Sequence, residues 1–335
     1  MQNLLVYSTK AYHSFSEEWL PHRDCNEFWS LYAVLRGSGF SYGFRLEIRH
    51  LQGLFDSFDE AYFALNDLEQ GNFWSHRYLL PHVARSRQQD MIFDHNSFFC
   101  RDNIQMLLED GHLALRIRGE DFFLDFSAEL SAEDIWVDNG GGLRILSGPR
   151  PMSSLMCGWK PMRACFAKLK HSGKEELRLQ GEACFERIWG CFPIHNAKSH
   201  WEKFCFLLHN GEILSLLDFP YAEKSYAWLI SGEKGLSSFS GQKLNVEDSL
   251  EIEEWRFGCG WYLELPERPS YFLVSLQKDE FVLPVPRPVL GVYDEAGLHL
   301  GTAFAELMPG ARNELNTIPL KIHHNYLKEG KPEIL

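Results

Sequence analysis

Short apolar runs joined by turn residues dominate the pattern of hydrophobic and polar positions in this chain. Residues 204–208 and 213–219 are two such runs, and Asn210-Gly211 lies between them. Because Asn and Gly both tolerate the positive φ angles of a tight turn, this arrangement predicts a β-hairpin. The same pattern predicts two more hairpins, formed by 104–108 with 113–117 and by 289–292 with 298–307.

Further runs of aromatic, β-branched and other apolar residues predict strands at 40–48, 122–126, 261–265 and 271–276. Residues 54–68 are a segment whose spacing also fits helical turns. Many short strands between turn signals are typical of a β-sandwich or β-barrel. The sequence therefore predicts an all-β, mostly antiparallel fold with few short helices.

The length of the chain, 335 residues, predicts two domains, since single cores rarely grow past about 250–300 residues. A loop-rich passage in the middle contains Gly140-Gly141-Gly142 and residues 147–151, and a polar stretch follows at 168–176. We therefore predict one β domain over residues 1–178 and a second over residues 179–335.

The composition indicates which classes of molecule the protein can bind. Aromatic residues make up 14% of the chain, which favours β-sheets and also suits a cavity for an apolar ligand. The formal net charge of −13 disfavours nucleic acid, because an acidic surface repels phosphate. A hydrophobic small molecule is the expected partner, and the oligomeric state stays open.

No segment has the pattern of a signal peptide or a transmembrane helix, so we expect a cytoplasmic protein with reduced cysteines. The eight cysteines never form C-x-x-C, and the 14 histidines include no H-E-x-x-H. A glycine-rich loop with a following Lys-Ser or Lys-Thr is also lacking. We therefore expect neither a metal nor a cofactor.

One element carries a family resemblance. The stretch from Gly181 to Gly190, GEACFERIWG, resembles the G-x-A-W-x-[DE]-[HR]-x-W-G element of the carotenoid 1,2-hydratase (hydroxyneurosporene synthase) and AttH-like group. Similar landmarks follow in family order at 201–212, 216–218 and 300–307, and residues 26–30 are a degraded version of the family's E-W-W-Y element.

The resemblance implies two tandem lipocalin-like β-barrel halves with a pocket between them. It also implies work on apolar substrates: hydration of a terminal double bond in one branch, and cyclisation, including Diels–Alder-type reactions, in others. Because one fold supports many functions, the resemblance alone does not choose among these reactions.

Asp218 is the first candidate catalytic residue. It lies in an otherwise apolar run, 213–219, where desolvation favours the neutral acid that could protonate an alkene. The resemblance adds that an Asp at this position is implicated in the hydratases. The alternative is that Asp218 ends a strand and accepts hydrogen bonds in the turn at Pro220.

Glu186, Arg187 and Trp189 form the second candidate cluster. In a strand, Arg187 and Trp189 share one face and Glu186 lies on the other. The hydratases carry His where this chain has Arg187, and Arg stays protonated, so it can hold a carboxylate or polarise a carbonyl but not transfer a proton. The alternative is a structural ion pair of Arg187 with a carboxylate that joins the two halves.

Further residues are expected to line the pocket of each half: Glu27 and Trp29 in the first, Trp201 and Glu202 in the second. Each of them also fits a purely structural role. Two functions stay open: a cofactor-independent cyclase or hydratase, in the isomerase or lyase class, for an isoprenoid or polyketide-like substrate, and a carrier that binds a hydrophobic molecule unchanged. The retained Asp218 and Glu186 favour the enzyme, whereas Arg187 in place of His favours the carrier.

Overall fold

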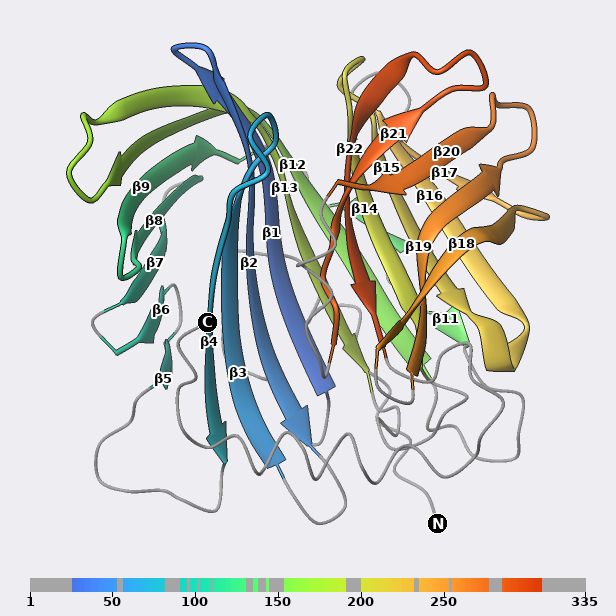
Figure 1. Ribbon diagram of the computed structural model, residues 1–335. Helices are drawn as coiled ribbons and strands as arrows, with labels where there is room; N and C mark the ends of the chain where they lie inside the picture. The colour runs from blue at the N-terminus through green and yellow to red at the C-terminus, as the bar shows by residue number, and fades with distance from the viewer. Residues whose placement is uncertain are drawn as a thin grey trace, which may run out of the picture. The chain divides into compact units, whose positions relative to one another are not determined.

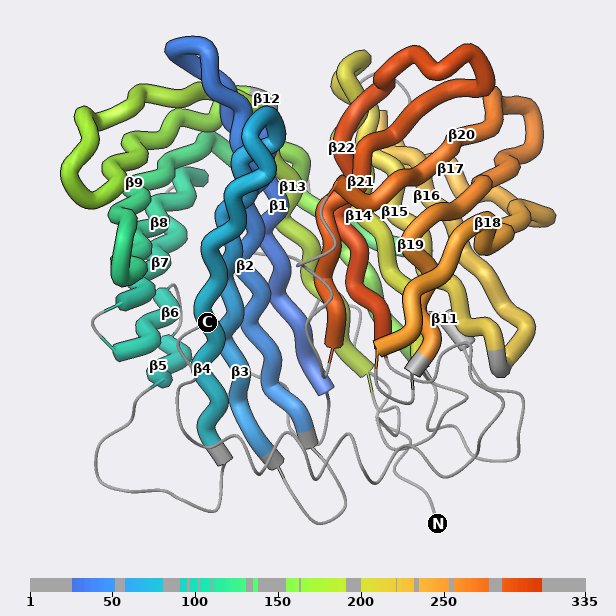
Figure 2. The backbone as a smooth tube through the Cα atoms, in the orientation of Figure 1, coloured from blue at the N-terminus to red at the C-terminus, as the bar shows by residue number. Residues whose placement is uncertain are grey.

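The protein is described here from a computed structural model, and the figures draw it as a ribbon and as a tube (Figures 1 and 2). The structure describes residues 26–52, 57–81, 91–94, 97–101, 103–109, 111–130, 135–137, 143–144, 154–190, 200–231, 235–252, 255–276 and 285–308. Most of these residues lie in antiparallel β-strands, as the sequence predicts. None of the helices in these ranges is long and apolar enough to cross a bilayer.

Thirteen of the strands form the first sheet, coloured blue to yellow-green in Figure 1. Its main path has the order β4-β3-β2-β1-β13-β12-β9-β8-β7-β6-β5, and β10 and β11 pair with β12. The bounds are β1 (Asn26–Gly37), β2 (Phe40–Gln52), β3 (Ser57–Asp67), β4 (Phe73–Pro81), β5 (Met91–Asp94), β6 (Ser97–Cys100), β7 (Ile104–Glu109), β8 (His112–Arg118), β9 (Phe122–Glu129), β10 (Ile135–Trp136), β11 (Leu143–Arg144), β12 (Ser154–His171) and β13 (Leu177–Gly190).

Nine strands form the second sheet, coloured yellow to red, in the order β17-β16-β15-β14-β22-β21-β20-β19-β18. A single-turn 3-10 helix, Pro220–Ala222, follows β15. The bounds are β14 (Glu202–Leu208), β15 (Ile213–Phe219), β16 (Lys224–Ser231), β17 (Gly235–Phe239), β18 (Lys243–Ile252), β19 (Trp255–Glu264), β20 (Tyr271–Ser275), β21 (Val289–Tyr293) and β22 (His299–Leu307).

The three predicted hairpins are confirmed as β7–β8, β14–β15 and β21–β22. Gly111 and Gly211 have φ near +78° in two of the turns, the conformation that made them turn signals. The helical alternative for 54–68 is wrong, because Ser57–Asp67 is strand β3. Both faces of β3 are largely buried, so its apolar residues do not alternate with polar ones as in a half-exposed strand.

Among the described residues, one compact unit comprises 26–64 and 75–190, and the other comprises 65–74 and 200–308. Residues 179–190, which the sequence prediction assigned to the second domain, belong to β13, and β13 pairs with β1 and β12 of the first sheet. The polar stretch 168–176 is the exposed end of the β12–β13 hairpin. Its composition indicates a turn exposed to solvent, which a sequence pattern does not distinguish from a linker.

Each sheet curls around its own aromatic core, and Figure 2 shows the curl of each tube. In the first sheet, two rings of β9 contact distant strands. The Phe126 ring lies 6.3 Å from Phe44 on β2, and the Phe122 ring lies 5.8 Å from Phe63 on β3. In the second, Phe204 on β14 packs edge-on against Trp261 on β19 at 5.3 Å. Contacts between strands this far apart in the sheet order define an inner face for each sheet.

Candidate active site

A buried ion pair is the centre of the candidate site. Arg187 on β13 donates hydrogen bonds from Nε and Nη2 to Oε1 of Glu27 on β1, and the Nε–Oε1 distance is 2.8 Å. The two side chains are 2% and 0% exposed. Arg187 is therefore paired with a carboxylate of the neighbouring strand in the same sheet, as in the structural alternative, except that the pair does not join the two halves.

Two tryptophans enclose the guanidinium. Its Cζ lies 5.7 Å from the ring centroid of Trp29 and 4.9 Å from that of Trp189. In the register of the sheet, Trp29 is opposite Arg187 and Glu27 is opposite Trp189, so all four side chains share one face. This is the inner face, because Trp29 also contacts Phe93 on β5 at 5.3 Å.

A glycine makes room for a third indole beside this pair. Gly158 on β12 lies opposite both Arg187 on β13 and Trp136 on β10. A Cβ at Gly158 would lie 2.2 Å from the Trp136 ring. Trp136 packs edge-on against Trp189 at 5.1 Å. The absence of a side chain at Gly158 therefore lets the third ring close over the ion pair.

We call Glu27, Trp29, Arg187, Trp189 and Trp136 the Arg187 site. It combines one fixed cation with three indole rings in a buried setting. A guanidinium has five N–H groups, and the bonds to Glu27 use two of them. The arrangement can therefore bind an oxygen of an apolar molecule while the rings contact its hydrocarbon part.

Glu186 lies on the opposite face of β13, as the period of two predicts. It is 1% exposed, and its Oε1 accepts a hydrogen bond of 2.9 Å from the Trp159 indole. The structure therefore does not bring Glu186 to Arg187.

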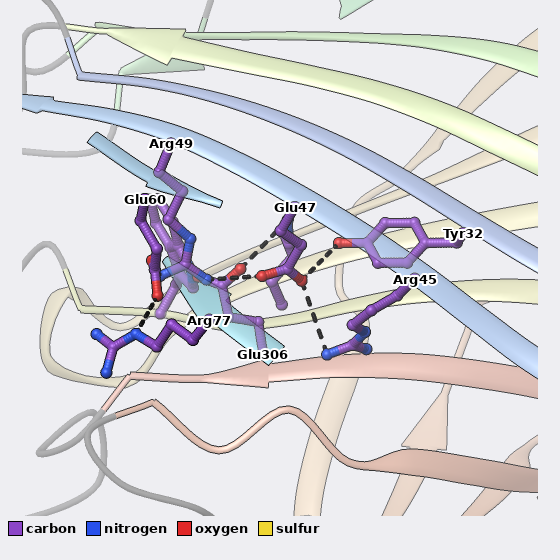
Figure 3. Close-up of polar contacts among 9 residues, drawn as sticks. Tyr32, Arg45, Glu47, Arg49, Glu60, Arg77 and Glu306 are labelled. Carbon is purple, nitrogen blue, oxygen red and sulfur yellow. Dashed lines mark hydrogen bonds and ion pairs between the residues drawn. The ribbon is translucent and has the colours of Figure 1, made fainter. Parts of the chain in front are cut away.

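The opposite face of the first sheet also carries a charged network that the sequence analysis missed (Figure 3). The Arg49 guanidinium lies 2.8 Å from the Glu47 carboxylate and 3.3 Å from the Glu60 carboxylate. Arg77 lies 2.7 Å from Glu60. Tyr32 and Arg45 also contact Glu47, at 3.4 and 3.7 Å. Opposite charges alternate along this network, which offsets the cost of burying them. The signal in the sequence was the alternating 45–49 run, RLEIR.

A hydrogen-bonded His–Asp pair lies near the Arg187 site and was also missed. His50 on β2 is opposite Glu27 in the register, and its Nδ1 lies 2.7 Å from Oδ1 of Asp59 on β3. The side chains are 13% and 18% exposed, so the pair is more accessible than Arg187. His50 also contacts Phe93 at 6.4 Å, the ring that Trp29 contacts.

In the second sheet, the structure brings Asp218 and Glu202 together. They are opposite each other in the β14–β15 register, on the face that carries Phe204, the inner face of this sheet. Glu202 is buried and Asp218 is half-buried. Asp218 thus lies between Glu202 on β14 and Ser225 on β16.

Trp201 lies on the other face of β14 from Glu202. Its indole donates a 2.9 Å hydrogen bond to Oε1 of Glu306 on β22, and Lys203 lies 3.5 Å from Oε2 of the same carboxylate. The Trp201 indole and the Lys203 ammonium therefore share one buried carboxylate, which is typical of a structural cluster.

Cysteine and metal chemistry find little support in the part of the chain that the structure describes. No disulfide joins the cysteines there, and burial raises the pKa of Cys165 to about 12, so its thiol stays protonated at neutral pH. Among the same residues, no group of three or more His, Cys, Asp or Glu side chains is placed to hold a metal ion. Cys25 and Cys191 lie outside the described residues.

Solved structures share this fold at low sequence identity. No family model and no curated protein matches the chain in sequence. A protein named as an AttH from Nitrosomonas europaea superposes with a TM-score of 0.70 at 16% identity, over 88% of this chain and 96% of that one. Kievitone hydratase from Nectria haematococca gives a TM-score of 0.63 at 11% identity, over 90% and 94%.

A further structure is CghA, solved with the compound Sch210972, with a TM-score of 0.52 at 12% identity over 85% of this chain and 89% of that one. These matches cover both sheets. At this level of identity they show the fold, and they agree with the resemblance carried by residues 181–190. The chain therefore has the tandem lipocalin-like fold of the AttH-like group.

Proposed function

We propose that this protein is a cofactor-independent hydratase or cyclase that acts on a carbon–carbon double bond of an apolar isoprenoid or polyketide-like substrate. Arg187 binds an oxygen of the substrate, and Trp29 and Trp189 contact its apolar part. The observation that carries the proposal is the guanidinium held between two indole rings on the inner face of the first sheet. Kievitone hydratase shares the fold and supports a hydratase-like reaction.

The chemistry of Arg187 suits this reaction. In a site shielded from water, a fixed cation stabilises negative charge that develops on a carbonyl oxygen more strongly than it would in water. Glu27 holds the guanidinium in one orientation, so little reorganisation is needed when the substrate binds. The flanking rings exclude water and bind hydrocarbon.

Asp218 is the proposed acid for a cationic route on an isolated double bond. Its position opposite Glu202, on the inner face of the second sheet that also carries Phe204, supports this role. The two routes make different demands on the substrate: Arg187 needs an oxygen near the double bond, whereas Asp218 needs only the double bond.

Purification of the protein from its own host, followed by native mass spectrometry, tests the proposal. We expect an apolar compound to copurify, and the wild-type protein to convert it or its precursor without added cofactor. We expect Arg187→Met to abolish conversion. Asp218→Asn should abolish it only if the reaction follows the cationic route. Arg268→Met, which removes a more exposed arginine paired with Glu212, should keep conversion, and circular dichroism must show that Arg187→Met is folded under the assay conditions. A compound that wild type binds and returns unchanged would instead identify a carrier.

A further inference from the structure

The Arg187 site has a hydrogen-bonded His–Asp pair on the same face of the sheet. His50 is directly opposite Glu27, and Glu27 is directly opposite Trp189, so one row of residues crosses β2, β1 and β13. Residues in one such row point to the same side. The row therefore places the imidazole of His50 on the inner face that also carries Arg187.

Two aromatic rings, Trp29 and Phe93, connect Arg187 to His50. Phe93 on β5 contacts both Trp29, at 5.3 Å, and His50, at 6.4 Å. The Trp29 ring in turn contacts the Arg187 guanidinium. A cation, an indole, a phenyl ring and an imidazole thus follow one another along the inner face of the sheet.

The hydrogen bond to Asp59 determines which nitrogen of His50 can act as a base. A carboxylate only accepts hydrogen bonds, so Nδ1 carries a hydrogen and Nε2 is the basic nitrogen of the neutral ring. A carboxylate that orients an imidazole in this way also stabilises the imidazolium after proton uptake. The 2.7 Å distance between Nδ1 and Oδ1 is short enough for this role.

Resting on the proposed function, we propose that His50 is the proton-transfer residue of the reaction, that Asp59 is its positioning residue, and that the reacting double bond is conjugated with the carbonyl oxygen that Arg187 binds.

The reaction balances without a further reactant. Nε2 of His50 accepts a proton from water, or from a hydroxyl group of the substrate, while that oxygen bonds to the far carbon of the double bond. The π electrons move to the carbonyl oxygen, where Arg187 stabilises the enolate. The imidazolium then returns the proton to the carbon next to the carbonyl, which gives a hydroxy ketone from water or a cyclic ether from the substrate hydroxyl.

Deuterium exchange with a saturated ketone isolates this step. Dihydrochalcone is an apolar ketone with two phenyl rings, and it cannot add water, but base-catalysed enolisation in D2O exchanges the hydrogens next to its carbonyl. We expect wild type to catalyse this exchange, measured by mass spectrometry. We expect His50→Ala to lose about 100-fold or more of the rate, with partial rescue by added imidazole. Asp59→Asn should lower kcat with little change in KM.

The control is His112→Ala, because His112 is exposed on β8 and should leave the exchange unchanged. If His50→Ala exchanges the ketone as fast as wild type, or if wild type does not exchange it at all, the proposal for His50 is wrong. The proposed function fails separately, when wild type does not convert the compound that copurifies with it.

Discussion

At the scale of single residues, the central feature is the choice of arginine at position 187. A guanidinium is planar, so it fits between the Trp29 and Trp189 rings while its N–H groups reach the Glu27 carboxylate. Lysine has neither the plane nor the fixed fork of donors. Because the pair is buried, either charge is costly if its partner is removed.

Removal of one partner should therefore destabilise the fold strongly. We expect Glu27→Gln and Arg187→Met each to lower the free energy of unfolding by about 3–5 kcal/mol. The double variant should be more stable than either single variant, since it leaves no unpaired buried charge. Urea denaturation measures all three. Arg268→Met, at a more exposed pair, should cost about 1 kcal/mol or less, and equal losses at the two sites would contradict this interpretation.

His76 on β4 should make the stability depend on pH. Burial lowers the pKa of His76, and Arg101 lowers it further, while Glu120 opposes the shift. The unfolded chain therefore binds this proton more readily than the folded protein. Stability should fall as the pH drops through the ordinary histidine range, about 6.5.

Thermal melts between pH 7.5 and 5 of wild type and His76→Gln measure this contribution, at about half-unit intervals. The variant should lose less stability at the acid end than wild type does. Exposed His112, replaced by Gln, is the control and should follow wild type. An equal acid loss in wild type and His76→Gln would show that this histidine does not contribute.

At the scale of elements, sequence patterns identified the strands with one exposed face and the turns. In β7, β8 and β9, buried residues alternate with more accessible ones, and this period of two is visible in the sequence. In β1 and β14 nearly every residue is buried, so the alternation disappears and only the length of the apolar run remains. Strand β3, residues 57–67, is buried on both faces in the same way, and for that reason this segment also fitted a helix.

Gly158 should be needed for the β10–β12 contact that covers the Arg187 site. Gly158→Ala places a methyl group against the Trp136 ring, and we expect a loss of about 1–3 kcal/mol in stability together with a change in tryptophan emission. In a Trp136→Ala background the same glycine change should cost much less. Equal costs in the two backgrounds, measured by urea denaturation, would rule out this clash.

At the scale of the whole molecule, the candidate site depends on pairings that no local pattern contains. Glu27 and Arg187 are 160 positions apart in the chain and meet because β1 and β13 are neighbours. The sequence pattern identified both residues as candidates and predicted the face of β13 on which Arg187 lies, but it did not predict that the two side chains pair with each other. It missed His50 and Asp59 because a lone His and a lone Asp on adjacent strands carry no spacing signal.

The strand order predicts how protection from hydrogen exchange varies along the chain. β1, β12 and β13 lie in the middle of the first sheet, and β14, β15 and β22 lie inside the second. β4, β5, β17 and β18 end the two sheet orders. We expect the inner strands to exchange slowest, because their backbone groups are paired on both sides. Mass spectrometry of deuterium uptake measures this, and equal uptake in β5 and β13 would contradict the strand order.

The most direct test of the central claim is a crystal structure of the protein with the apolar compound that copurifies with it. We predict that an oxygen of the compound lies within hydrogen-bonding distance of the Arg187 guanidinium, with its hydrocarbon part against Trp29 and Trp189 and its double bond near His50. A compound bound instead against Asp218 and Glu202 on the second sheet, with the Arg187 site unoccupied, would contradict it.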